Sequence, residues 1–180
     1  MNDVPQIFDA RLLAARRARA RALAVPGADF LFERAAADLG ERLAAIRRSF
    51  ASAAIIGPDT GALADALAAT VPAHDIVTVP IEAGAGGERI DLPPATLDLV
   101  ASVLALQFVN DLPGVLTQIR RALKGDGLFL GVLAGGETLR ELREVLTIAE
   151  TEIRGGAASS IDCSRASEAL RVCDPGIGDQ

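Results

Sequence analysis

Apolar positions along the chain follow two periods, one typical of buried strands and one typical of amphipathic helices. Short unbroken apolar runs predict strands at residues 53–56, 74–79, 97–104 and 128–133. Helical spacing of apolar residues predicts helices at residues 7–23, 30–49, 62–70, 115–123 and 136–154. Strands that alternate with helices in this way predict an α/β fold with a mostly parallel sheet.

The segment from residue 97 to residue 133 carries the strongest structural signal. An apolar strand leads to Asn110-Asp111, then to an amphipathic helix, a Lys-Gly-Asp-Gly turn at 124–127 and a second apolar strand. Because polar and glycine residues mark both ends of the helix, this segment is typical of a strand–helix–strand unit in a parallel sheet.

Pro80–Gly87 is rich in glycine, and a phosphate-binding loop is one interpretation of it. Such a loop needs backbone amides at the start of a helix. The sequence Asp-Leu-Pro-Pro follows at 91–94 instead of a helix start. We therefore expect a flexible surface loop at 80–87.

Composition favours a single domain in a reducing compartment. A chain of 180 residues with 50% hydrophobic content can bury a sizeable core. It has no apolar run of membrane-spanning length, and its arginine-rich start lacks the apolar core of a secretory signal. Cys163 and Cys173 are poor support for a disulfide framework. We expect a cytoplasmic protein with no transmembrane span, with His74 at the surface and no cluster of metal-ligand spacing.

The net charge of −6 conceals a basic first quarter. Residues 1–50 carry nine basic and six acidic side chains. The chain has six Phe and neither Trp nor Tyr, so it lacks the stacking residues of most nucleic-acid interfaces, and we expect no nucleic-acid partner. Three interpretations of the arginines in helix 7–23 stay open. They are a solvated helix face, or a basic lid or docking surface for an acidic partner or a membrane surface, or part of an organelle-targeting segment. Asp3 and Asp9 count against the targeting segment.

Three motifs resemble a known family. Asp98-Leu99-Val100 with Leu104–Pro113 is similar to D-L-V…L-x-L-H-W-V-N-D-L-P, Ile119–Gly127 is similar to I-x-x-x-L-K-P-D-G, and Gly135–Arg143 is similar to G-G-D-T-L-x-E-L-R. These motifs resemble class I S-adenosylmethionine-dependent methyltransferases. The resemblance is greatest to the malonyl carrier-protein methyltransferases of biotin synthesis and to bacterial relatives of the arginine hydroxylase of mitochondrial complex I assembly.

The resemblance implies a Rossmann-like three-layer sandwich, S-adenosylmethionine as cofactor, and a set of cofactor-binding positions. In the loop after the first strand, Gly57 and Gly61 match the outer family glycines, whereas Asp59 replaces the middle one and Pro58 removes an amide donor. Pro80 stands where the family has its ribose-binding acid, with Glu82 as a substitute if the loop is rearranged, and Gly87 stands at the adenine-binding acid, with Glu88 adjacent. Leu106 is the last of the expected cofactor-binding residues. The family's cofactor contacts are weakened at three positions, those of Asp59, Pro80 and Gly87.

Asn110 and Asp111 are the expected substrate or loop contacts, because ligands of open α/β sheets collect beyond the carboxyl ends of strands. Asp111 equally suits an N-terminal helix cap. Gln107 and Phe108 replace the family's His and Trp, and no catalytic residue is assigned.

The expected organisation is an N-terminal helical cap (1–50), a methyltransferase-like core (51–156) and an irregular tail (157–180). The family's C-terminal strand pair is absent, so strand 128–133 would be an exposed edge through which the chain could dimerise. Two functions remain open. One is a methyltransferase-like enzyme of unknown substrate, including an arginine hydroxylase, with weakened or lost cofactor binding. The other is a non-catalytic assembly or binding protein, of the complex I assembly type, that contacts a protein partner.

Overall fold

The structure, a computed structural model, describes residues 6–58, 61–72, 75–84 and 87–155. The chain divides into two compact units, residues 1–133 and residues 134–180. The expected irregular tail at 157–180 lies outside the described residues, as does His74. The expected division at residues 50 and 156 stays a prediction.

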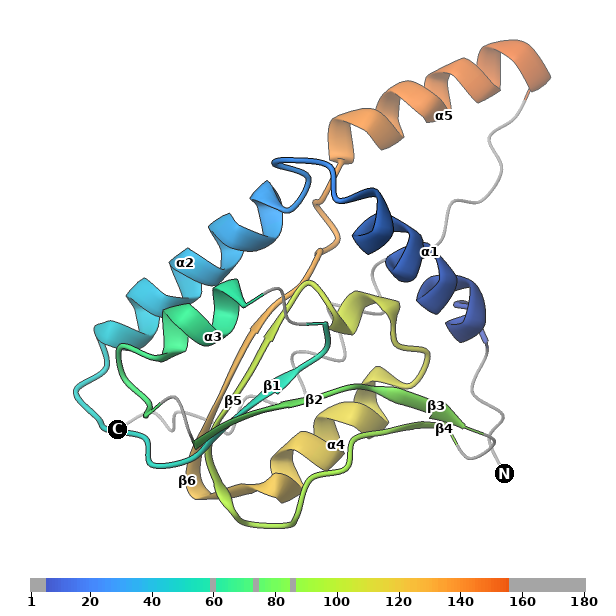
Figure 1. The fold of residues 1–180 in the computed structure, drawn as a ribbon. Helices are drawn as coiled ribbons and strands as arrows, with labels where there is room; N and C mark the ends of the chain where they lie inside the picture. Colours follow the sequence, from blue (N-terminus) through green and yellow to red (C-terminus); the bar gives the residue numbers. More distant parts are fainter. Residues whose placement is uncertain (1–5, 59–60, 73–74, 85–86, 156–180) are drawn as a thin grey trace, which may run out of the picture. The chain divides into compact units, whose positions relative to one another are not determined.

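The first unit contains a four-stranded sheet, a small hairpin and the helices that surround them (Figure 1). Its helices are α1 (Ala10–Leu23), α2 (Phe30–Ala44), α3 (Ala62–Leu67), the short 3₁₀ helix η2 (Leu106–Phe108) and α4 (Leu112–Ala122). Its strands are β1 (Ala53–Ile56), β2 (Ile76–Val79), β3 (Glu82–Gly84), β4 (Gly87–Arg89), β5 (Leu97–Val103) and β6 (Leu123–Val132).

The sheet has the order β2-β1-β5-β6, and all three strand pairings are parallel. The chain therefore adds β2 on one side of β1 and then crosses to place β5 on the other side. The point where the order reverses lies between β1 and β5, and open α/β sheets bind ligands at the carboxyl ends of such strands. Within the described residues β6 is an edge strand, as the sequence predicts.

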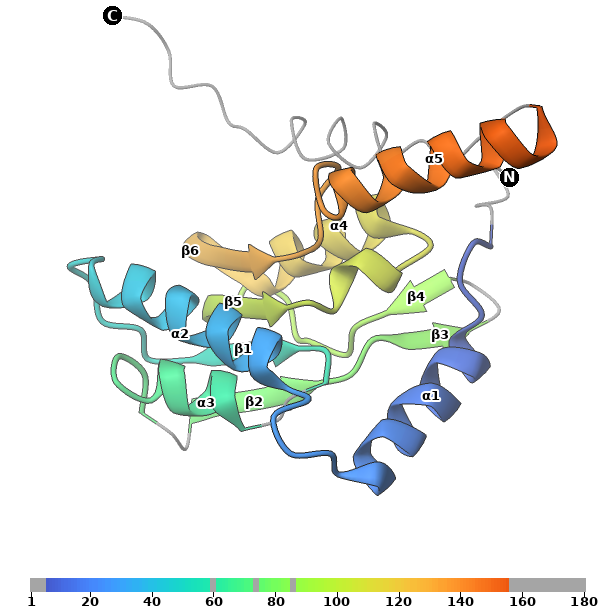
Figure 2. The ribbon, with the colours of Figure 1, turned by 90° about the horizontal axis from the view of Figure 1, so that it is seen from above.

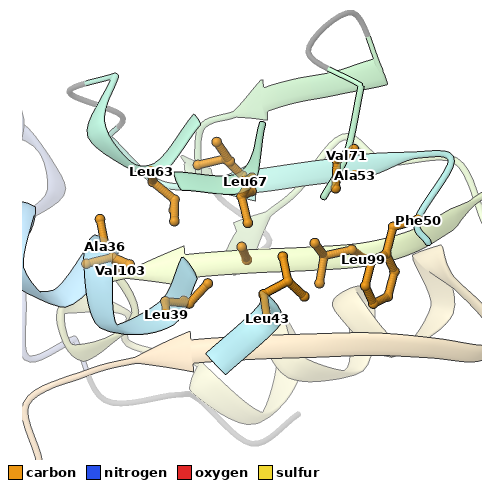
Figure 3. Close-up of a cluster of buried hydrophobic side chains, with 12 residues drawn as sticks. Ala36, Leu39, Leu43, Phe50, Ala53, Leu63, Leu67, Val71, Leu99 and Val103 are labelled. Atoms are coloured by element: carbon orange, nitrogen blue, oxygen red, sulfur yellow. The ribbon is translucent and has the colours of Figure 1, made fainter. Parts of the chain in front are cut away.

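Both faces of the sheet are covered, which explains the unbroken apolar runs of β1 and β5. On one face, α2 and α3 pack against the sheet, with Leu39, Leu43, Leu63 and Leu67 buried among side chains of β1 and β5 (Figures 1 and 3). On the other face, α4 is packed through a second cluster that includes Val115. The predicted Rossmann-like three-layer sandwich is confirmed.

Asp98, one residue into β5, ties together the amino-terminal ends of three strands. Its Oδ1 lies 2.8 Å from Lys124 Nζ on β6, and its Oδ2 accepts hydrogen bonds from the amides of Ala51 and Ser52, just before β1, at 3.2 Å. Two of the family-like motifs thus meet in one ion pair. The hydrogen bond from Lys124 is the main reason why the pKa of Asp98 lies below its ordinary value.

Three local predictions are corrected. The segment 80–87 is not a simple surface loop, because it contains β3, which pairs with β4 as an antiparallel hairpin that extends to Arg89. The expected turn at 124–127 lies inside β6, where the β5 pairing shifts register between Leu97 and Leu99. Helix α4 begins at Leu112 rather than Val115, because the Asp111 side chain caps it.

The second unit is described from Ala134 to Gly155 and contains α5 (Arg140–Arg154). The sequence predicts an inner, buried face on this helix. Within this unit Leu142, Val145, Leu146 and Ile148 are exposed. Whether this face is buried against another part of the protein stays a prediction.

Candidate functional site

A cavity of about 480 Å³ lies where α1 faces the carboxyl ends of the strands. Its lining comes from α1, from the residues that follow β1, β2 and β5, and from the β3–β4 hairpin. Figure 2 shows α1 on the side toward which β5 and β6 point. The volume falls in the range of small-molecule sites, about 300–1,000 Å³.

Gly57 lines the cavity and lies against Ala105, another lining residue. Its φ is +110°, and its amide donates to the carbonyl of Val79 at 3.1 Å. A Cβ at this position would lie 2.4 Å from the Cβ of Ala105, which follows β5. A glycine is therefore required where the residue after β1 meets the segment after β5.

Glu88 lines the cavity, but its carboxylate already has two partners. Oε1 accepts from the amide of Asn110 at 2.8 Å, and Oε2 accepts from the amide of Asp111 at 3.0 Å. The acid on β4 thus fixes the loop between η2 and α4. Asp111 in turn accepts from the Gly114 amide at 2.9 Å, the helix-cap role that its position suggested.

Asn110 fastens the N-terminal segment to the rim of the cavity. Its Oδ1 accepts from the amides of Ile7 and Phe8 at 2.7 and 2.8 Å, and its Nδ2 donates to the Phe8 carbonyl at 3.1 Å. Asp9 follows at once and caps α1 by accepting from the amides of Arg11 and Leu12. The start of α1 is therefore held above the cavity by polar contacts from two sides.

Replacing Asn110 by alanine should release this segment. Each lost hydrogen bond is worth about 0.5–1.5 kcal/mol, so we expect the amides of Ile7 and Phe8 to exchange with solvent at least about tenfold faster. Hydrogen exchange read by NMR measures this. Asn110→Asp keeps the accepting oxygen and should stay close to wild type at both amides. Equal exchange in Asn110→Ala and wild type would contradict this role.

The remaining predicted cofactor positions are scattered. Asp59 lies outside the described residues. Gly61, at φ +89°, begins α3, and exposed Glu82 on β3 is not among the described residues that line the cavity. Leu106 is 2% exposed and packs in the cluster beneath α4. Whether these residues contact a cofactor stays a prediction.

Sequence reasoning did not single out the cavity face of α1. Leu13, Arg17 and Arg21 line the cavity at a spacing of four residues. The Arg17 guanidinium lies 5.7 Å from the centre of the Phe108 ring, and Phe8 meets that ring edge to face at 5.8 Å. Partial burial, followed by the charge of Arg21, lowers the pKa of Arg17 from its ordinary value.

A family model described as "Methyltransferase domain" matches residues 39–131, more than half of the chain. The match runs from within α2 to the last but one residue of β6 and includes Gly57, Glu88 and Asn110. The chain belongs to the methyltransferase-domain family. This methyltransferase domain places its cavity beyond the carboxyl ends of β1 and β5, as the fold leads one to expect.

Curated relatives confirm both resemblances that the motifs indicate. The mitochondrial arginine-hydroxylase NDUFAF5 of Rattus norvegicus is 39% identical over an aligned length of 150 residues, and the alignment covers 74% of this chain and 43% of that protein. A malonyl-[acyl-carrier protein] O-methyltransferase of Gallionella capsiferriformans is 42% identical over 57 residues, 32% of this chain and 20% of the relative. The chain thus spans less than half the length of these relatives.

A solved SAM-dependent methyltransferase of Thermotoga maritima is similar with a TM-score of 0.49 and 15% identity, over 90% of this chain and 77% of that one.

In the part of the chain that the structure describes, no helix is long and apolar enough to cross a membrane. The same residues contain no group of three His, Cys, Asp or Glu side chains that could hold a metal ion.

Proposed function

We propose that this chain is the S-adenosylmethionine-binding domain of a methyltransferase-like protein, and that the cofactor binds in the cavity beneath α1. One observation carries the proposal: the cavity lies at the reversal point of the strand order, with Gly57 and Ala105 in contact there. Membership in the methyltransferase-domain family supports S-adenosylmethionine as the ligand.

The described lining fits a nucleoside with an apolar environment. Gly57 adds no side chain to the lining, while Pro80, Ile81 and Ala83 contribute apolar surface to it. When bound, the cofactor supplies an electrophilic methyl group. The chain's own residues would hold the cofactor and the methyl acceptor in the right orientation. Methyl transfer depends mostly on this positioning of the two reactants.

The affinity is expected to be modest. Pro80 stands where the family places a ribose-binding acid, and both oxygens of Glu88 already accept from backbone amides. Each missing polar contact costs about 1–3 kcal/mol, and each 1.4 kcal/mol is about tenfold in affinity. We expect a dissociation constant on the order of 100 µM for S-adenosylhomocysteine.

Calorimetric titration with S-adenosylmethionine and S-adenosylhomocysteine tests the proposal. Ala83→Trp should block the cavity and abolish binding. Arg89→Trp is the matched control, because Arg89 lies on the same hairpin but is exposed and not among the described lining residues. No heat at millimolar ligand, on wild-type protein shown to be folded by circular dichroism, would refute the proposal.

The second candidate is a non-catalytic assembly or binding protein. It is favoured by Glu88 and Asn110, whose side chains are engaged in holding the loop and the N-terminal segment together. The relatives named arginine-hydroxylase keep that enzymatic activity open as well. The same titration separates the non-catalytic candidate from the first function, since a protein that needs no cofactor should bind neither nucleoside. The protein partner, the cytoplasmic location and dimerisation through β6 stay predictions.

A further inference from the structure

Three arginines of α1 line the cavity: Arg11 in the first turn, and Arg17 and Arg21 further along the helix. Arg17 and Arg21 are four residues apart and line the cavity together with Leu13. Arg16 and Arg19 are exposed and are not among the described lining residues. Arg17 and Arg21 can therefore be compared with a second pair on the same helix, Arg16 and Arg19, which does not line the cavity.

The described lining carries more positive than negative charge. Arg11, Arg17 and Arg21 contribute three guanidinium groups, and Glu88 is the one acid of the described lining. Both oxygens of Glu88 are occupied by backbone amides, and none of the ion pairs among the described residues involves Arg17 or Arg21. Among the described residues, these two cations therefore have no carboxylate partner, and they face a largely apolar cavity.

Arg17 is also held in place before any ligand binds. Its guanidinium lies over the Phe108 ring, Phe8 packs edge to face on that ring, and Asn110 fixes the backbone of Phe8. The pKa of Arg17 is lowered, first because its side chain is half-buried and then because Arg21 is nearby. A bound anion at this position would relieve the unfavourable positive charge. A fixed guanidinium loses little entropy when it binds an anion.

We propose that Arg17 and Arg21 form a carboxylate-binding site that selects the ligand of this cavity. A guanidinium presents paired N–H donors that match the two oxygens of a carboxylate. The inference rests on the proposed function, because the carboxylate belongs either to the amino-acid part of the cofactor or to the methyl acceptor beside it.

Titrations of three proteins with two nucleosides test the site. S-adenosylhomocysteine carries a carboxylate, whereas 5′-methylthioadenosine lacks the amino-acid part. Wild type should bind S-adenosylhomocysteine at least about tenfold more tightly, and the Arg17→Gln/Arg21→Gln variant should lose that advantage. Its affinity for 5′-methylthioadenosine should stay within about twofold, which also shows that it is folded. The Arg16→Gln/Arg19→Gln variant is the matched control and should behave as wild type.

A third titration distinguishes the source of the carboxylate. If the Arg17→Gln/Arg21→Gln variant binds S-adenosylhomocysteine as wild type does, succinate is titrated as a carboxylate probe into protein saturated with 5′-methylthioadenosine. Succinate binding that is lost only in this variant assigns the site to the methyl acceptor. If that variant matches wild type for both carboxylates, the inference is overturned while the proposed function stands. If wild type binds neither nucleoside, the proposed function fails and the inference fails with it.

Discussion

Replacing Gly57 by alanine should lower the free energy of unfolding by about 3 kcal/mol. A residue with a side chain at φ +110° is strained by about 1–3 kcal/mol. The added Cβ would also lie 2.4 Å from the Cβ of Ala105, and overpacking of this kind costs about 1–3 kcal/mol. Neither atom belongs to a flexible side chain, so the ends of β1 and β5 would have to move apart.

Urea unfolding measures this loss, and two further variants separate its causes. Gly61 also has positive φ, at +89°, but a Cβ there meets nothing within 4 Å, so Gly61→Ala should show the strain alone. Ala105→Gly removes the opposing Cβ, so combining it with Gly57→Ala should recover the overpacking part as a measurable coupling energy. A Gly57→Ala protein as stable as wild type would show that the contact does not exist in solution.

The fold was predictable because its strongest signals are local. The runs 53–56 and 97–103 are unbroken and apolar since these strands are buried on both faces, and α4 is preceded by a capping Asp111. The β3–β4 hairpin escaped prediction because its strands have three residues each, too few for an alternating pattern to stand out among glycines.

The candidate site was less predictable because its contacts join distant parts of the chain. Gly57 was predicted from the resemblance to the family's glycine loop, and Asn110 from its position after a strand. The partners of Asn110 were not, since Phe8 is 102 residues away and no local pattern links them. The role of Glu88 was missed for the same reason, as its carboxylate binds a loop 22 residues later. The arginines that face the cavity were hidden because α1 has no buried residue to reveal which side faces inward.

Replacing Asp98 by alanine should lower the free energy of unfolding by about 3 kcal/mol. The side chain is nearly buried, and its loss would leave the amides of Ala51 and Ser52 and the ammonium of Lys124 without their acceptor. The Ser52 hydroxyl, 3.0 Å from Oδ2, would lose a partner as well. Asp38 gives the matched control: its pair with Arg42 is exposed, so Asp38→Ala should leave the urea midpoint nearly unchanged.

The same carboxylate predicts how stability depends on pH. Its pKa in the folded protein is lowered, first by the hydrogen bond from Lys124, whereas in the unfolded chain it is expected near the ordinary value of about 3.9. The folded state therefore binds this proton less readily, so the stabilisation is complete above about pH 5 and is lost as the pH falls through the folded pKa. Urea unfolding from pH 7 to pH 3 should show a decline that is shallower in Asp98→Asn, which carries no ionisable group there. Parallel declines in the two proteins would mean that Asp98 does not contribute to acid sensitivity.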